Sequence, residues 1–434
     1  MELTNYPKTT LYLAIFALLI IVFILASLFT SFTEEDIDIS STSPILVGTP
    51  EFRTAVESVT NSTALPQDTG IILFTDGREF LTDLLKEIEG AENSITITNY
   101  IFQEGKMADE TFDALTVAAE RGVEVRLLLD AIGGHKANEE KLEALKDAGG
   151  KVEVFRPTTF RSLTRIHRRT HMRAIVIDGK IGYTGGLAFQ DEWYGDGTSE
   201  KEWRDTMFKY DGRMARATQD LFNGLWRQTN GEILTGPKFY PPLNSPEVTE
   251  QNTYFVSLFH SPSPDLSADL LDLIWLSITG AKDHIYLSTP YLTPDKEITT
   301  ALKKAVERGV RVEIMVPGTY TDTKLIQSAS RAHYEELLEA GVHIYEYQPG
   351  RFHEKSLVVD GHWSLIGSAN MDNRSATLNV ENVFGIEDKR IAKLLEEEFA
   401  HNKENAQEIL LEEFRPNLFK RVYYHTLRLL SKQF

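Results

Sequence analysis

The amino-acid sequence predicts an α/β fold built from two copies of one domain, preceded by a transmembrane helix. Three observations predict it: a strand–helix–strand order that occurs twice, one histidine-containing pattern in each copy, and an uncharged apolar run near the N-terminus. At 434 residues the chain exceeds what one hydrophobic core usually organises, so two cores are expected.

The first element is the apolar run over residues 11–32, and residues 1–33 are expected to form a transmembrane anchor. At about 1.5 Å per residue, a helix of this length spans a hydrocarbon core of about 30 Å. A cleaved signal peptide is the alternative, but its apolar region is usually only about 7 to 15 residues long. Lys8 precedes the run and four acids follow between residues 34 and 38. This charge bias favours a single-pass protein in the cell membrane, with a cytoplasmic N-terminus and the remaining chain outside.

Residues 34–69 are rich in Ser, Thr, Pro and acids and lack sustained periodicity, which predicts a linker. The first folded domain is expected over residues 70–245. Apolar spacing over residues 80–88 predicts an amphipathic helix, followed by a strand at 94–100. A second helix then leads into a buried strand at 123–129, which completes a strand–helix–strand unit.

The same order returns near residue 280. Residues 91–100 are echoed by residues 281–291, and the Glu-Arg-Gly-Val of 120–123 recurs at 307–310. The offset stays near 190 residues, so the chain is an internal duplication. The second domain is expected over residues 246–405.

Residues 406–434 are expected to form a basic amphipathic tail. After Glu413 the sequence has basic residues, interleaved apolar residues and no acid. Such a helix could lie on anionic lipid, or it could dock its apolar side on the folded body.

The most informative residues are two copies of one motif. HMRAIVIDG begins at His171, and HEKSLVVDG begins at His353. Each motif is expected to begin a strand, where alternation puts the histidine and the cation two residues later on one face. In both copies a turn of small residues begins 14 residues after the histidine, at Gly185 and at Gly367.

These motifs resemble the phospholipase D superfamily, whose signature is HxK(x)4D followed by a GG or GS turn. The resemblance covers about residues 70–400. It is closest to bacterial cardiolipin synthase-like members, on the segments GYTGGLAFQDEW, WRDT, GSANMDNRS and NVEN. It implies two α/β sandwiches, related by a pseudo-two-fold axis, that share one active site at their interface.

The resemblance also implies a membrane phosphatidyltransferase that joins two phosphatidylglycerol molecules into cardiolipin and releases glycerol. It implies no cofactor and no metal. A phosphodiester repels anionic nucleophiles, and its alkoxide leaving group needs a proton. By resemblance, His171 is the nucleophile that forms a phosphohistidine, and His353 is the general acid and later the base. The residues alone would permit the reverse assignment.

Further site residues follow from the resemblance. Arg173, Lys355 and Asn370 would hold the non-bridging phosphate oxygens where charge develops. Asp178 and Asp360, each seven residues after its histidine and followed by glycine, are expected to have a structural role in a turn.

Each histidine is also expected to bond a carboxylate through its second ring nitrogen, which fixes the tautomer. The matching positions assign Asp205 to His171 and Glu381 to His353, that is, one pair within each domain.

Two positions depart from the family pattern. Arg173 stands where the pattern has Lys, and guanidinium groups fork around phosphate differently from ammonium groups. Ala188 stands where the second copy has Asn370, so the first copy has fewer phosphate donors. These departures could mean reduced activity or a changed role for the first motif.

Charge and composition limit the kinds of molecule that this protein is expected to bind. The net charge of −19, from 45 basic and 64 acidic residues, argues against a nucleic-acid partner, although related sites cleave DNA. Five arginines precede His171 and either attract an anionic lipid such as phosphatidylglycerol or are solvated surface charges; they are Arg156, Arg161, Arg165, Arg168 and Arg169. Two further alternatives are a phospholipase D-type hydrolase and a catalytically degenerate scaffold that binds anionic lipid.

Overall fold

The computed structural model describes residues 39–42, 45–67, 70–158, 167–243, 253–261, 269–414, 416 and 418–430, with four helical positions near the N-terminus. Across these residues, no helix is long and apolar enough to cross a membrane. The predicted anchor at residues 11–32 lies outside the described part of the chain apart from those four positions.

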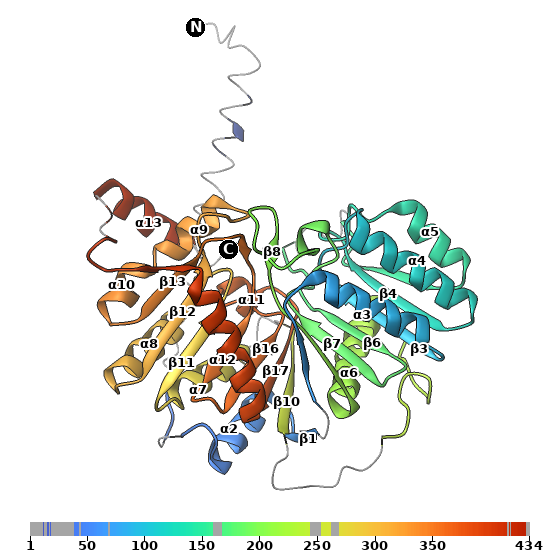
Figure 1. Ribbon diagram of the computed structural model, residues 1–434, viewed down its shortest axis with the longest axis horizontal. Helices are drawn as coiled ribbons and strands as arrows, with labels where there is room; N and C mark the ends of the chain where they lie inside the picture. The colour runs from blue at the N-terminus through green and yellow to red at the C-terminus, as the bar shows by residue number, and fades with distance from the viewer. Residues whose placement is uncertain are drawn as a thin grey trace, which may run out of the picture.

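The first half is one seven-stranded sheet covered by helices on both faces (Figure 1). In sheet order its strands are β2 (Ile72–Phe74), β9 (Met207–Asp211), β7 (Ile181–Gly185), β6 (Ala174–Ile177), β3 (Ser94–Asn99), β4 (Glu124–Asp130) and β5 (Lys151–Phe155). Helices α3 (Gly77–Gly90), α4 (Lys106–Glu120) and α5 (Glu139–Asp147) cover one face, and α6 (Gly212–Asn230) covers the other.

The second half repeats this plan with a nine-stranded sheet. Its strands, in sheet order, are β1 (Leu65–Gln67), β10 (Thr253–His260), β17 (Glu381–Glu387), β16 (Trp363–Gly367), β15 (Ser356–Val359), β11 (His284–Ser288), β12 (Arg311–Pro317), β13 (His343–Tyr347) and β18 (Ala406–Ile409). Its helices are α7 (Asp269–Thr279), α8 (Lys296–Glu307), α9 (Lys324–Arg331), α10 (Tyr334–Glu339), α11 (Asn373–Thr377) and α12 (Lys389–Glu404).

The duplicated order predicted from the sequence is present in both halves. Strands β3 and β4 pair in parallel across α4, and β11 and β12 pair in parallel across α8. Each crossover helix ends just before a glycine with positive φ, Gly122 at 88° and Gly309 at 91°. Glycine adopts this left-handed conformation without a steric penalty, so both helices stop at the same point of the repeat.

The segment predicted as a linker is partly folded, which corrects that expectation for residues 50–67. Helix α2 (Pro50–Thr60) is capped by Thr49, and Phe52 and Val56 are buried in the second-half core. Strand β1 then pairs antiparallel with β10. The apolar residues of α2 recur four residues apart, as on one face of a helix, and this spacing could have predicted the helix from the sequence.

The C-terminal segment also joins the fold. Strand β18 pairs with β13, and helix α13 (Leu418–Leu430) lies against α9. Leu427 of α13 is buried, whereas Phe419 and Val422 are exposed. The helix therefore docks by one side, one of the two alternatives left open by the sequence, and keeps exposed apolar residues on another.

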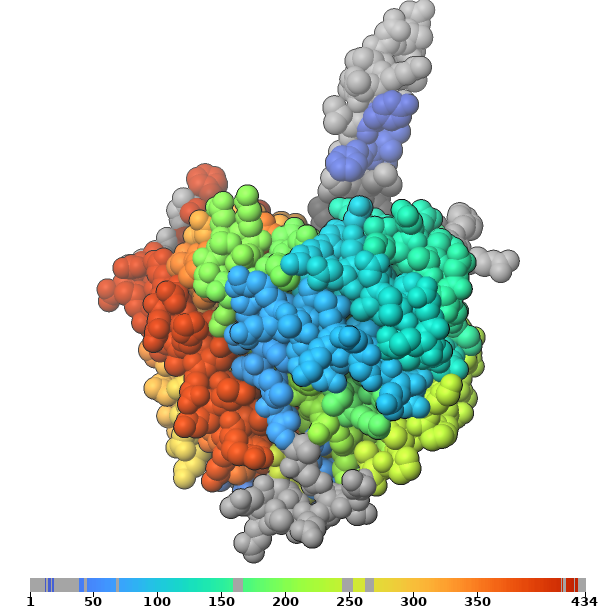
Figure 2. Space-filling view, turned by 45° about the vertical axis from the view of Figure 1, so that its right-hand side comes forward, coloured from blue at the N-terminus to red at the C-terminus, as the bar shows by residue number. Residues whose placement is uncertain are grey.

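The two halves share an apolar core to which α6 of the first half, α12 of the second half and strands of both sheets contribute. Buried members of this core include Phe222 and Trp226 on α6 and Leu395 on α12. Figure 2 shows the blue-to-green surface of the first half in continuous contact with red surface from the C-terminal part of the chain. This packing fixes the position of one half relative to the other, which the site requires.

Candidate active site

Two short backbone pairings cross the interface and position the motifs. Strand β8 (Trp203–Arg204) runs parallel to β14 (Arg351–Phe352), and the N–H of His353 donates to the carbonyl of Arg204 at 2.8 Å. On the other side, the N–H of His171 donates to the carbonyl of Val380 at 2.8 Å. Each histidine therefore lies beside the residue that precedes the carboxylate of the opposite half.

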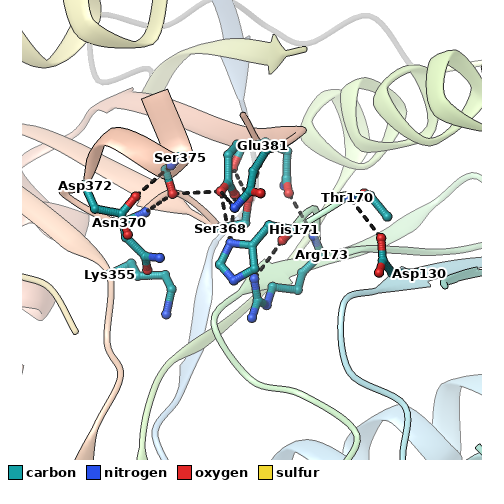
Figure 3. Close-up of polar contacts among 12 residues, drawn as sticks. Asp130, Thr170, His171, Arg173, Lys355, Ser368, Asn370, Asp372, Ser375 and Glu381 are labelled. Atoms are coloured by element: carbon teal, nitrogen blue, oxygen red, sulfur yellow. Dashed lines mark hydrogen bonds and ion pairs between the residues drawn. The ribbon is translucent and has the colours of Figure 1, made fainter. Parts of the chain in front are cut away.

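The carboxylate pairs are crossed between the halves. His171 Nδ1 lies 3.0 Å from Glu381 Oε1 and 3.1 Å from Oε2, as Figure 3 shows, and His353 Nδ1 lies 2.6 Å from Asp205 Oδ2. The prediction that Asp205 supports His171 and Glu381 supports His353 is wrong. The parallel register across the interface brings each carboxylate to the other half's histidine.

Hydroxyl groups from the second half hold the carboxylate of Glu381. Ser368 Oγ donates to Oε2 at 2.5 Å, and Ser375 Oγ donates to Oε1 at 2.8 Å. Glu381 is fully buried, so these bonds satisfy oxygens that water cannot reach. They also fix the carboxylate against the ring of His171.

Different donors hold Asp205. Trp193 Nε1 donates to Oδ2 at 3.0 Å, and the N–H of Thr206 donates to Oδ1 at 2.8 Å. Gly186, at the position of Ser368 in the second copy, makes room for this arrangement, because a Cβ there would lie 2.0 Å from Asp205 Oδ1.

Sequence reasoning missed Trp193 and Ser375 as residues that hold the carboxylates. Each stands 22 residues after its own motif histidine, at 193 against 171 and at 375 against 353. The equal spacing was a usable signal, although the residue types differ because one carboxylate is Asp and the other is Glu.

Aromatic rings surround His353. Trp193 stacks on Trp203 with ring centroids 4.9 Å apart, and both present an edge-to-face contact to the imidazole at 5.4 and 5.1 Å. Tyr291 approaches the same ring at 6.3 Å. These contacts leave the imidazole little freedom to rotate away from Asp205.

Both histidines open onto one cavity of about 400 Å³ at the interface. A cavity of this size is in the range of small-molecule sites. The first half contributes Tyr100, Ile101, His171, Arg173, Gln190, Trp193 and Trp203, and the second contributes Tyr291, Thr293, Asp322, Ile326, Arg351, His353, Asn370, Asp372, Arg374 and Asn379.

Arg173 is a buried cation on the cavity wall. Its Nη1 donates to the carbonyl of His171 at 2.7 Å, and its backbone N–H donates to Asn382 Oδ1 at 2.9 Å. Its Nε and Nη2 have no hydrogen-bond partner within the described residues. Two unused guanidinium donors beside a histidine suit an anionic ligand.

Lys355 lies against His353 instead of lining the cavity wall. Its Nζ is 2.8 Å from His353 Nδ1 and 2.5 Å from the His353 carbonyl oxygen. Burial lowers the pKa of Lys355 to about 7, although Asp205 opposes the change. Its ammonium group is therefore only partly charged at neutral pH.

Burial lowers the pKa of His171 well below its ordinary value, and the cations Arg173 and Lys355 lower it further. Burial also lowers the pKa of His353, to about 3, again with a contribution from Lys355. Both imidazoles are therefore neutral near pH 7, as a nucleophile requires. An anion bound between them would raise the pKa of both.

The two carboxylates differ in acidity. Burial raises the pKa of Glu381 to about 7, despite the hydroxyl of Ser368 and the charge of Arg173. Burial acts on Asp205 as well, but Lys355 and His353 outweigh it, so the pKa of Asp205 is lowered. Asp205 is thus the more firmly ionised, and it favours a proton on His353.

The turn aspartates lie away from the cavity. Asp178 and Asp360 both have a φ of 54°. The Asp178 carboxylate accepts the backbone N–H groups of residues 92–94, and that of Asp360 accepts those of residues 282–284. Each side chain ties the turn after its motif to the strand beside it.

Ala188, one of the two departures, is buried in the first-half core, so the Asn370 position has no polar counterpart there. Of the arginines before His171, Arg169 is buried 3.5 Å from Asp130, and Arg156 donates to the carbonyl of Arg168. The other two, at positions 161 and 165, lie outside the described residues.

The comparisons with known proteins agree with this geometry. The family model described as "Cardiolipin synthase, PLD-like domain" matches residues 84–226 and 274–403. A cardiolipin synthase of Geobacillus kaustophilus is 35% identical over 386 residues, which cover 88% of this chain and 75% of that protein. One of Halalkalibacterium halodurans is 33% identical, with the same coverage of both chains.

A phosphatidylserine synthase of Haemophilus influenzae has a similar solved structure, with a TM-score of 0.69 at 17% identity, over 88% of this chain and all of that one. At this identity the likeness shows the fold alone. The match to the family model, and the identity to relatives over 75% of their length, go further. The chain is an enzyme of the phospholipase D superfamily and belongs to its cardiolipin synthase family.

Proposed function

We propose that this protein is a membrane-anchored phosphatidyltransferase that joins two phosphatidylglycerol molecules into cardiolipin and releases glycerol. The observation that carries the proposal is the pair of crossed histidine–carboxylate contacts, which open onto one cavity beside the unused donors of Arg173. The cardiolipin synthases similar to this chain support the choice of lipid.

In the first step the neutral imidazole of His171 attacks phosphorus of the donor lipid. The P–N bond forms, the P–O bond to glycerol breaks, and His353 gives its proton to the departing glycerol oxygen. Arg173 stabilises the charge on the non-bridging oxygens from the cavity wall, and Lys355 adds positive charge from its place against His353. The anionic substrate raises the pKa of His353, so the imidazole can carry the proton that it gives to the departing glycerol oxygen.

In the second step a hydroxyl of the acceptor lipid attacks the phosphohistidine. Its proton passes to His353, the new P–O bond forms, and the P–N bond to His171 breaks. Both histidines then return to their starting states. Water as the acceptor would give phosphatidic acid, so the hydrolase alternative uses the same groups with a different second substrate.

The test uses purified protein in phosphatidylglycerol vesicles, with His171→Ala and His353→Ala as controls and lipid products identified by mass spectrometry. Cardiolipin and free glycerol, both lost in the two variants, support the transferase. Phosphatidic acid alone identifies a hydrolase. No turnover together with retained lipid binding identifies a scaffold.

The anchor and its orientation belong to the same proposal, supported by the apolar run at residues 11–32 and its flanking charges. The chain has no cysteine, so a single cysteine introduced into the second half can be labelled without background. Labelling of intact cells by a membrane-impermeant maleimide is expected if the catalytic part lies outside. Labelling only after lysis would reverse the orientation.

Anionic-lipid selectivity is supported by Arg173 and Arg374 on the cavity wall. Replacing phosphatidylglycerol with phosphatidylcholine in the vesicles is expected to abolish phosphatidyl transfer. Equal turnover of both lipids would contradict this selectivity.

A further inference from the structure

One wall of the cavity has a chemistry that does not suit a phosphate. Asp322 and Asp372 both line it, and the hydroxyl of Tyr291 donates to Asp322 Oδ2 at 2.8 Å. Burial raises the pKa of Tyr291 well above its ordinary value, and both carboxylates raise it further. Carboxylates on this wall repel an anionic headgroup and accept hydrogen bonds from hydroxyl groups.

The wall of the cavity beside His171 has different charges near its tyrosine. Tyr100, the counterpart of Tyr291 in the repeat, contacts the ring of His171 at 5.4 Å. Burial and Asp130 raise the pKa of Tyr100, whereas Arg374 and Arg173 oppose the rise. The phosphate of the donor lipid therefore fits the His171 side, and an uncharged headgroup fits the side of Asp322 and Asp372.

Two buried oxygen atoms on the acidic wall have no hydrogen-bond partner among the residues that the structure describes. Thr293 Oγ1 and Asn370 Oδ1 belong to side chains that are 1% and 6% exposed, both line the cavity, and neither oxygen has a hydrogen-bond partner in the described part of the chain. Thr293 lies beside Asp372 through a backbone bridge, and the side chain of Asn370 bonds Asp372. Figure 3 shows Asn370, Asp372 and Lys355 together in the second half.

An unpartnered buried polar group costs about 1–3 kcal/mol. The amide oxygen of Asn370 can only accept, so it favours a ligand that supplies a hydrogen-bond donor, whereas the hydroxyl of Thr293 can donate or accept. The non-bridging oxygens of a phosphodiester carry no hydrogen and cannot supply that donor. A hydroxyl group can, because it donates one hydrogen bond and also accepts. Two neighbouring hydroxyls would serve the threonine, the amide oxygen and the carboxylates together.

We propose that Thr293, Asn370, Asp372 and Asp322 form a subsite for a vicinal diol, the glycerol headgroup of the acceptor lipid. This inference rests on the proposed function and adds how the acceptor is chosen. The ring of Tyr291 contacts His353 on this side, so one hydroxyl of the bound diol can face the imidazole that takes its proton. The subsite holds the other hydroxyl and so favours diols over water and simple alcohols.

The test is a competition between two acceptors that differ by one hydroxyl. The full chain in phosphatidylglycerol vesicles receives equal concentrations of 1,2-propanediol and 1-propanol, and the two phosphatidyl alcohols are measured by mass spectrometry. Both products arise from the same phosphohistidine, so their ratio reports the second step alone. The parent protein is expected to favour the diol by about 2- to 10-fold for each hydrogen bond to the second hydroxyl.

Thr293→Val removes the hydroxyl at nearly constant volume, and Asp322→Asn removes a charge at the cavity mouth. Each is expected to move the product ratio toward one by about 2- to 10-fold. Thr323→Val is the matched control, because Thr323 neighbours Asp322, does not line the cavity and makes no capping hydrogen bond. Its product ratio is expected to equal that of the parent.

The outcomes separate this inference from the proposed function. Cardiolipin formation by the parent with a diol preference near one would overturn the subsite and leave the transferase intact. A strong preference unchanged in both Thr293→Val and Asp322→Asn would overturn the assignment of residues. Absence of every transfer product from the parent would refute the proposed function, and the subsite with it.

Discussion

Replacing Asp205 by asparagine tests which histidine this carboxylate supports. The contact between Asp205 Oδ2 and His353 Nδ1 is 2.6 Å long, and both side chains are buried. A hydrogen bond to a charged group contributes about 1.5–3 kcal/mol, which corresponds to about a 10- to 150-fold change in rate. Complete loss of a general acid, about 10²–10⁴-fold, sets the upper limit.

The assay compares two donors that differ in the need for a proton. Glycerol leaves phosphatidylglycerol only with a proton from His353, whereas p-nitrophenolate leaves the corresponding phosphatidyl ester without one. Single-turnover formation of the phosphohistidine is measured with each. Asp205→Asn is expected to slow the reaction of phosphatidylglycerol by about 10- to 150-fold and to leave that of the nitrophenyl ester nearly unchanged.

Glu381→Gln is the matched control, because Glu381 contacts the proposed nucleophile His171. It is expected to slow both donors alike. The reverse pattern, with Asp205→Asn affecting both donors and Glu381→Gln only phosphatidylglycerol, would refute the assignment of roles to the crossed pairs. Thermal melting of both variants shows whether a lost rate reflects unfolding.

Three further predictions concern the space that Gly186 leaves for Asp205, the charge of Lys355, and the ion pair between Arg53 and Glu387. Gly186→Ala is expected to lower phosphatidyl transfer about as much as loss of the Asp205 contact, because the added Cβ would lie 2.0 Å from Asp205 Oδ1; full activity would contradict the reasoning. Burial lowers the pKa of Lys355 to about 7, so kcat/KM should fall as pH rises through about 7. Lys355→Arg should move this fall in kcat/KM to higher pH, because a guanidinium group stays charged. If the fall does not move, it comes from the titration of another group. Glu387→Gln removes the 2.9 Å ion pair with Arg53 of α2 and the 3.4 Å contact with His362, and is expected to lower the free energy of unfolding by about 1 kcal/mol in denaturant titrations at pH 7. Although burial opposes it, hydrogen bonds from His362 and Arg53 lower the pKa of Glu387 from 4.5 to about 2. The difference in stability between variant and parent should therefore close as pH falls through that window, and a constant difference would show that it comes from packing.

The local features of the site could be predicted because the duplication repeats them. Equal spacing in the two motifs identified His171 and His353, and the structure brings both to one cavity. The helix that ends at Glu120 was also predictable, since Gly122 follows an amphipathic pattern. Both inferences use periodicity over a few residues, which sequence displays directly.

The carboxylate partners could not be assigned from sequence. Asp205 and Glu381 were recognisable as positions, but their pairing depends on how β8 meets β14 and how Val380 meets the strand before His171. That register depends on how the two halves pack together, in a core whose residues come from parts of the chain that are far apart in sequence. No local pattern encodes it.

Residues 50–67 show a second limit. Phe52 and Val56 have helical spacing, but the surrounding Ser, Thr and Pro composition indicates a linker. The segment folds because its apolar face packs on α7 and because β1 pairs with β10. Tertiary contacts outweigh composition here.

The crossed carboxylates carry a consequence for the origin of this protein. A single half on its own would leave its histidine without a carboxylate, so an ancestor with one copy could act only as a symmetric pair of subunits that exchanged these groups. With both copies in one chain, the two sites no longer have to be identical. The first half holds Asp205 with the indole of Trp193, whereas the second half holds Glu381 with Ser368 and Ser375. The proton affinities of His353 and His171 can therefore differ.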